Sequence, residues 1–219
     1  MRIVSPEEAV AGIKSRDQVY IQMAAATPSF LLDALVARAP ELHDVGVIHL
    51  HLEGPGPHLQ PEMAPHFRHR ALFIGPNARK AVNEGRADFV PVFFSDIPAL
   101  FSSGAYPLDA VFANVTPPDA HGFCSLGLSV EAMHEAIAAA KTVIVQLNPS
   151  IPRTWGESFI HVSQIDLAVE VDQPPFEYPL PAIGLVEQRI GAFIADLIPD
   201  GATLQLGIGA IPAATALAL

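Results

Sequence analysis

The sequence predicts an α/β protein with three layers, in which helices cover both faces of a mostly parallel sheet. Short apolar segments such as residues 142–147 (Thr-Val-Ile-Val-Gln-Leu) are typical of strands buried on both faces. Segments with helical periodicity alternate with them, as in consecutive βαβ units. The 21 prolines cluster between these segments and mark loops and element ends.

The expected elements follow in chain order from caps, periodicity and breakers. Ser5-Pro6-Glu7-Glu8 has the form of a capping box with proline at the first helical position, so a helix should run to about Ser15. Thr27-Pro28 should cap a second helix that ends before Pro40. Further helices are expected at residues 77–84, 95–102, 130–140 and 183–197. Strands are expected at residues 18–23, 45–52, 71–74, 89–94, 110–115, 142–147, 167–171 and 203–206. Residues 53–68, rich in proline and histidine, should form a long surface loop.

A proline-rich segment at residues 172–181 has the composition of an interdomain linker. Residues 1–175 should form one α/β domain, and residues 182–219 should begin a second. The second part holds only a helix, a strand, a glycine turn and the first turn of another helix, which is too little to enclose a core. Either these elements pack onto the first domain or the sequence is part of a longer chain, and we expect the second.

Composition excludes several classes of function. The balance of 12 basic and 23 acidic residues gives a net charge of −11, which disfavours binding to nucleic acid or to an anionic membrane. No run of about 18 apolar residues could span a bilayer, and the N-terminus lacks the apolar segment of a signal peptide. Cys124 is the single cysteine, so no intrachain disulfide is possible. We expect a cytoplasmic protein.

The most informative segment is Asp200-Gly-Ala-Thr-Leu-Gln-Leu-Gly-Ile-Gly-Ala-Ile-Pro212, an apolar run that leads into a glycine turn and a helix start. Backbone N–H groups at a helix N-terminus can hold a phosphate, a carboxylate or a developing oxyanion. A dinucleotide fingerprint would require glycine in place of Pro212 and an acidic residue about 20 positions later, and neither is available. A plain strand-to-helix turn is the structural alternative.

Three other groups of residues could carry chemistry. His49, His51 and Glu53 alternate along an expected strand and could converge on a metal, but Glu53 lies beside proline and glycine, where the alternation should fail. No metal site is therefore predicted, and these histidines should contact the proline-rich loop or line a cleft. Cys124 is expected to be a small buried residue and not a nucleophile. Arg79 follows a Gly-Pro-Asn helix start and could bind a carboxylate or phosphate, or simply be exposed.

Several segments, taken together and in order, resemble the acetyl-CoA hydrolase/transferase family, and especially its 4-hydroxybutyrate and acetate CoA-transferases. They are residues 71–88, 117–127, 158–163 and 200–212. The resemblance implies a class I CoA-transferase with two related α/β domains of the type found in glucosamine-phosphate and ribose-phosphate isomerases, and an active site between them. A family glutamate attacks the acyl-CoA thioester and is converted through an acyl anhydride to a glutamyl-CoA thioester. A carboxylic acid then receives the CoA.

The resemblance also implies roles for particular residues. The CoA-binding loop would comprise Gly207, Ile208, Gly209, Ala210 and Ile211. The substrate cleft would include Asn77, Arg79, Asp119 and His121. The nucleophilic glutamate would follow Leu219, so no catalytic residue is assigned within the chain, which alone should be inactive. Coenzyme A would be a substrate, with no tightly bound cofactor.

The expected partners are acyl-CoA, small carboxylic acids and further copies of the protein in a homo-oligomer. An acyl-CoA hydrolase, in which water replaces the second acid, remains an alternative. So does a non-catalytic α/β binding module, if the chain naturally ends at Leu219. Because the segments after Pro181 expose apolar faces, the isolated chain should self-associate.

Overall fold

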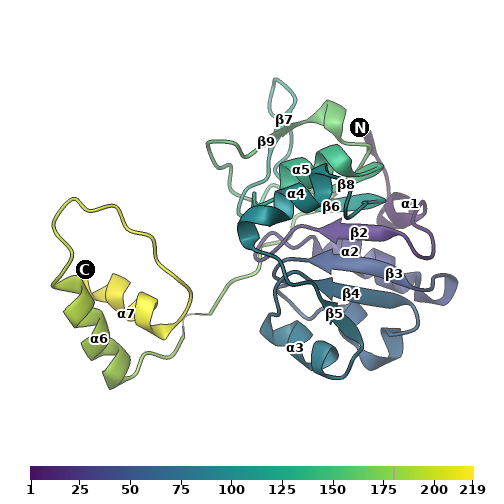
Figure 1. Cartoon of the computed structure of the whole chain (residues 1–219). Helices are drawn as coiled ribbons and strands as arrows, with labels where there is room; N and C mark the ends of the chain where they lie inside the picture. Colours follow the sequence, from purple (N-terminus) through teal and green to yellow (C-terminus); the bar gives the residue numbers. More distant parts are fainter. Residues whose placement is uncertain (180) are drawn as a thin grey trace. The chain divides into compact units, whose positions relative to one another are not determined.

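The computed structural model describes residues 1–179 and 181–219, which divide into two compact units, Met1–Phe176 and Glu177–Leu219 (Figure 1). In the described residues, no helix is long and apolar enough to cross a membrane.

The first unit is built on an eight-stranded sheet in which every neighbouring pair of strands is parallel. Its strands are β1 (Arg2–Ile3), β2 (Gln18–Ile21), β3 (Val45–His49), β4 (Phe67–Ala71), β5 (Ala87–Phe89), β6 (Ala110–Val115), β8 (Thr142–Leu147) and β10 (Leu167–Glu170). Their order across the sheet is β1-β10-β8-β6-β2-β3-β4-β5. Strands β7 (Phe123–Ser125) and β9 (Phe159–His161) form a separate antiparallel pair.

Helices lie on both faces of this sheet. They are α1 (Pro6–Val10), α2 (Ser29–Ala37), α3 (Pro76–Asn83), α4 (Ile97–Ser102) and α5 (Met133–Ala139). Short 3₁₀ helices are η1 (Ala39–Glu41), η2 (Pro57–Leu59), η3 (Pro61–Met63), η4 (Phe94–Asp96) and η5 (Val162–Gln164). The second unit contains α6 (Leu185–Ala195) and α7 (Ala210–Ala218), which pack against each other.

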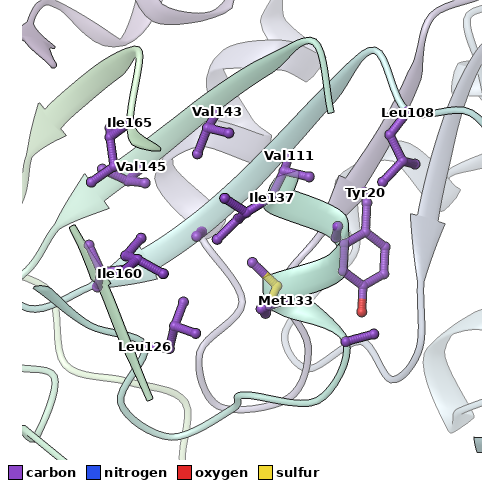
Figure 2. Close-up of a cluster of buried hydrophobic side chains, with 14 of the residues drawn as sticks. Tyr20, Leu108, Val111, Leu126, Met133, Ile137, Val143, Val145, Ile160 and Ile165 are labelled. Carbon is purple, nitrogen blue, oxygen red and sulfur yellow. The ribbon is translucent and has the colours of Figure 1, made fainter. Parts of the chain in front are cut away.

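Two apolar cores occupy the two faces of the sheet. On one face, α4 and α5 pack on the strands: the Phe101 and Tyr20 ring centroids are 4.8 Å apart, and Met133 and Ile137 join the same core (Figure 2). On the other face, α1 and α2 pack on the strands through residues such as Leu35. Burial of each such side chain contributes about 1.5–3 kcal/mol to folding. The predicted three-layer α/β class is confirmed.

The helix after Ser5 is shorter than predicted. The capping box is present, because the Ser5 hydroxyl accepts from the Glu8 N–H at 3.2 Å and the Glu8 carboxylate accepts from the Ser5 N–H at 3.4 Å. However, α1 ends at Val10 and does not continue to Ser15. The glycine at position 12 disfavours a longer helix, and the Arg38 guanidinium satisfies the Val10 carbonyl that α1 leaves free.

The cap predicted for the second helix is wrong. The Thr27 hydroxyl donates to the Ala24 carbonyl at 2.8 Å, and it does not accept from α2. Instead, the buried Gln146 side chain on β8 accepts from the Leu31 N–H at 3.0 Å. A side chain from a distant strand therefore replaces the local cap.

Two predicted strands are misplaced, and a third is absent. In place of the strand expected at residues 71–74, the structure has β4 at Phe67–Ala71. The two arginines can lie in this strand because Arg68 donates to the Asp88 carboxylate and Arg70 donates to the Gln18 side-chain oxygen. The strand expected at 89–94 is β5, which ends at Phe89. Residues 203–206 form no strand, since the described part of the second unit offers no neighbouring strand for hydrogen bonding.

Candidate functional site

The central strands β2 and β6 mark a topological switch point in the sheet. From β2 the chain proceeds to β3 on one side, and from β6 it proceeds to β8 on the other. In open parallel α/β sheets, ligands bind beyond the carboxyl ends of the strands at such a point. The loops that follow β2 and β6 flank this point, and the loops after β3 and β4 lie next to them on the β2 side of the sheet. We take the loops after β2, β3 and β4 as the candidate site, because the His51–Glu53 pair and the Asn77 contacts lie there.

The turn after β2 is fixed by buried polar contacts. Gln22 is fully buried; its amide nitrogen donates to the carbonyls of Leu126, at 3.0 Å, and Ser129, at 2.6 Å. Its amide oxygen accepts from the Asn114 N–H at 2.7 Å. These bonds hold the segment before α5 against the carboxyl ends of β2 and β6.

A second element of the site follows β3. Nε2 of His51 lies 2.8 Å from Oε1 of Glu53, so the imidazole donates to the carboxylate, and both side chains are partly exposed. The Asn77 amide nitrogen donates to the carbonyls of Leu52, at 2.8 Å, and Gly54, at 3.1 Å. This clamp ties the loop after β3 to the start of α3. An imidazole oriented by a carboxylate can offer its other ring nitrogen to a ligand oxygen.

The structure thus brings Asn77 beside His51 and Glu53, but it does not bring the four predicted cleft residues together. Arg79 lies exposed on α3 and forms no ion pair with any described residue. Asn77 and Arg79 follow β4, whereas Asp119 and His121 follow β6. These two strands are three strand positions apart in the sheet, or about 14 Å. The roles of Asn77 and Arg79 in the cleft stay predictions.

Asp119 and His121 lie in the loop between β6 and β7. The Asp119 carboxylate closes its own turn by accepting from the N–H groups of His121 and Phe123, both at 2.9 Å, and it pairs with Arg153 at 2.6 Å. Hydrogen bonds, first of all from the Phe123 N–H, lower the pKa of Asp119. These contacts give Asp119 a structural role in the loop, and a role in substrate binding stays a prediction for both residues. Cys124 next to them is fully buried, as predicted, and burial raises its pKa to about 11.

Of the three residues His49, His51 and Glu53, the last two are in contact but His49 does not join them, because β3 ends at His49 and the alternation stops there. His49 is instead buried between two other histidines, with ring centroids 5.8 Å from His58 and 5.7 Å from His69. Within the described part of the chain, no three His, Cys, Asp or Glu side chains are arranged to hold a metal ion. Burial lowers the pKa of all three buried histidines, that of His69 to about 4.

The glycine loop lies in the second unit and leads into α7. Gly209 is the N-cap of α7 with φ +135°, a conformation that other residues rarely adopt, and no side chain caps the helix. Ile208 is 83% exposed. A Cβ on Gly207 would meet nothing closer than Pro212 Cγ at 3.7 Å. The backbone around Gly207 is open to a ligand, and CoA binding by residues 207–211 stays a prediction.

Sequence reasoning missed the buried polar residues that shape the site. Gln22, Gln146 and Glu131 each bind the backbone of a distant segment. The two glutamines interrupt otherwise apolar strand sequences, and that interruption is the signal that could have identified them. Glu131 lies outside any strand, just before α5, and gives no such signal.

Comparison with known proteins confirms the resemblance found in the sequence. Residues 1–177 match the family model described as the acetyl-CoA hydrolase/transferase N-terminal domain. The 4-hydroxybutyrate coenzyme A transferase of Clostridium kluyveri is 44% identical over 218 residues, which cover 100% of this chain and 51% of that protein. The succinyl-CoA:acetate/propanoyl-CoA:succinate CoA transferase of Fasciola hepatica is 45% identical over 94% of this chain and 43% of its own length.

Solved structures agree with this. The crystal structure of 4-hydroxybutyrate CoA-transferase from Porphyromonas gingivalis has a TM-score of 0.83 and 34% identity, covering 99% of this chain and 51% of that one. The chain thus spans about half the length of the curated relatives it matches. By the match of its first 177 residues and its similarity to these transferases, the chain belongs to the acetyl-CoA hydrolase/transferase family.

Proposed function

We propose that the chain is part of a CoA-transferase that moves CoA from a short-chain acyl-CoA to a carboxylic acid such as acetate or 4-hydroxybutyrate. The observation that carries the proposal is the similarity along the whole chain to proteins named CoA transferases. The site after β2, β3 and β4 fits this role, because it lies where parallel α/β sheets bind ligands and exposes an imidazole held by a carboxylate.

In the proposed reaction, a glutamate carboxylate attacks the thioester carbonyl and the CoA thiolate leaves, which gives an acyl anhydride. The thiolate then attacks the glutamyl carbonyl and releases the first carboxylic acid. The acceptor carboxylate then attacks the carbonyl of the glutamyl-CoA thioester, which forms a second anhydride and releases the CoA thiolate. This thiolate attacks the acyl carbonyl of that anhydride, which yields the new acyl-CoA and restores the glutamate carboxylate. We assign the glutamate to the part of the relatives' length that this chain does not span. We assign contact with CoA to residues 207–211.

The activity can be tested with protein expressed from the complete reading frame. Incubation with butyryl-CoA and 4-hydroxybutyrate or acetate should yield the new acyl-CoA by chromatography, and borohydride should trap the glutamyl thioester. Release of free acid without transfer would favour the hydrolase alternative. If neither product forms with any short-chain pair, the enzymatic proposal is wrong and the binding-module alternative is favoured.

The CoA-binding role of the loop has a separate test in Gly207→Ala. Since the new Cβ would make only an ordinary contact within the chain, a loss of CoA affinity would report a close approach of the ligand to the backbone. Gly12→Ala, where a Cβ meets nothing within 4 Å, is the matched control. Equal CoA affinity for both variants in calorimetry would contradict the assignment.

A further inference from the structure

Glu131 lies just before α5 and is partly buried as a residue, with its carboxyl group turned inward. Its Oε2 atom is inaccessible to solvent and has no hydrogen-bond partner among the described residues. Its Oε1 atom accepts from the Met23 N–H at 3.3 Å, across 108 positions of sequence. A buried carboxyl group that binds a backbone amide so far away in sequence fixes two segments relative to each other.

The Tyr20 hydroxyl faces Glu131 from the sheet. Figure 2 shows the Tyr20 ring beside the first part of α5, where Met133 lies. The hydroxyl is buried and makes no hydrogen bond of ordinary geometry with a described residue. Tyr20 is the titratable side chain that acts on Glu131, and burial is the main reason why the pKa of Glu131 is raised to about 7.

The amide held by Glu131 belongs to a strained turn that touches the site. Ala24, the next residue, has φ +54°, which is uncommon for a residue with a side chain and persists only when its surroundings hold it. The Ala24 N–H donates to the His51 carbonyl at 2.7 Å, and Ala24 and Leu52 form an isolated parallel bridge. His51 in turn holds Glu53.

We propose that Glu131 is a positioning residue of the candidate site. Its carboxyl group holds the turn at Met23 and Ala24, and this turn sets the backbone that presents His51 and Glu53 to a ligand. What the site binds rests on the proposed function, whereas the positioning itself rests on contacts within the chain. A role limited to filling space beneath α5 would leave the site geometry unchanged when the carboxyl group is replaced.

Amide NMR of the ¹⁵N-labelled 219-residue chain tests the proposal without any activity assay. In the wild type, the Met23 amide shift should titrate with a midpoint of about 7, as Glu131 changes charge. In Glu131→Gln, which keeps an acceptor at the same place, the titration should vanish while exchange protection of the Met23 and Ala24 amides stays within about threefold of wild type. In Glu131→Ala, protection at both amides should fall about tenfold or more, and the His51 ring signals should shift.

Glu135→Gln, one turn along on α5, is the matched control and should preserve the titration at Met23. The proposal is overturned if Glu131→Ala leaves the Ala24 amide and the His51 signals as in the wild type, or if the Met23 titration persists in Glu131→Gln. The isosteric Glu131→Gln variant keeps the test decisive should the alanine variant not fold. In protein from the complete reading frame, kcat/KM should fall about tenfold in Glu131→Ala and recover in Glu131→Gln. An inactive wild type would contradict the proposed function and leave the NMR result standing.

Discussion

Acid should destabilise the first unit through its buried histidine cluster, which comprises His49, His58 and His69. Nε2 of His58 and Nδ1 of His69 are 3.0 Å apart and share a hydrogen bond, whereas neither ring nitrogen of His49 has a partner among the described residues. A proton added to any of these rings would place a charge in a buried site, where no carboxylate among the described residues pairs with it. The folded state therefore holds the rings neutral at acidic pH values where the unfolded chain binds protons.

The magnitude can be worked out for His69. Its pKa falls from 6.5 to about 4 on folding because of burial. Above pH 6.5 the ring is neutral in both states and contributes no pH dependence. As the pH falls below 6.5, the unfolded state gains the proton first, so the free energy of unfolding decreases by about 1.4 kcal/mol per pH unit until the pH nears 4. Between about pH 7.5 and 5, His69 alone should lower stability by about 2 kcal/mol.

Urea unfolding of wild type and His69→Leu, followed by circular dichroism at both pH values, measures this effect. The substitution also removes a buried hydrogen bond, which should lower stability by about 1–3 kcal/mol at both pH values and cancels in the comparison. The decrease in stability from pH 7.5 to 5 should be about 2 kcal/mol smaller in the variant. His43→Gln, at an exposed position, should retain the wild-type decrease. The reasoning is refuted if His69→Leu and the wild type lose equal stability on acidification.

Three further outcomes are expected. Gly191→Ala should lower the stability of the α6–α7 pair by about 1–3 kcal/mol, because the new Cβ would lie 2.7 Å from the Ala214 carbonyl carbon; unchanged unfolding of these helices by amide exchange would contradict this. Cys124, with its raised pKa and buried sulfur, should react with a thiol reagent at pH 8 at least about tenfold more slowly than free cysteine, and rapid labelling of the native protein would contradict this. Leu197 and Ile208, 81% and 83% exposed, should promote self-association, which sedimentation velocity would detect as species larger than 23.3 kDa; a stable monomer at high concentration would contradict this.

The sheet could be predicted from the sequence wherever a strand is buried on both faces. The bounds expected for residues 110–115 and 142–147 are those of β6 and β8, because these central strands meet apolar neighbours on each side. At β4 the same rule failed. Arg68 and Arg70 alternate with buried residues and reach Asp88 and Gln18, so the charges that suggested a loop are compatible with a strand near the sheet edge.

Short strands were missed for a different reason. β1 has two residues, and β7 and β9 have three each, which is too few for a period of two to be recognised. Their existence depends on partners far away in sequence: β1 pairs with β10, and β7 pairs with β9. Such pairings are tertiary contacts that local patterns do not encode.

The candidate site shows the same division between local and tertiary information. Asn77 was named because it lies in segment 71–88, which resembles the family, and the structure places it against the loop that carries His51 and Glu53. Glu131 was not identifiable, since its importance arises only when the segment before α5 meets the turn after β2. A residue that acts on a site through the backbone of another segment has no motif of its own. Its signal in the structure is a buried polar atom beside a strained turn, and that combination directs mutagenesis to Glu131 before the more conspicuous exposed residues.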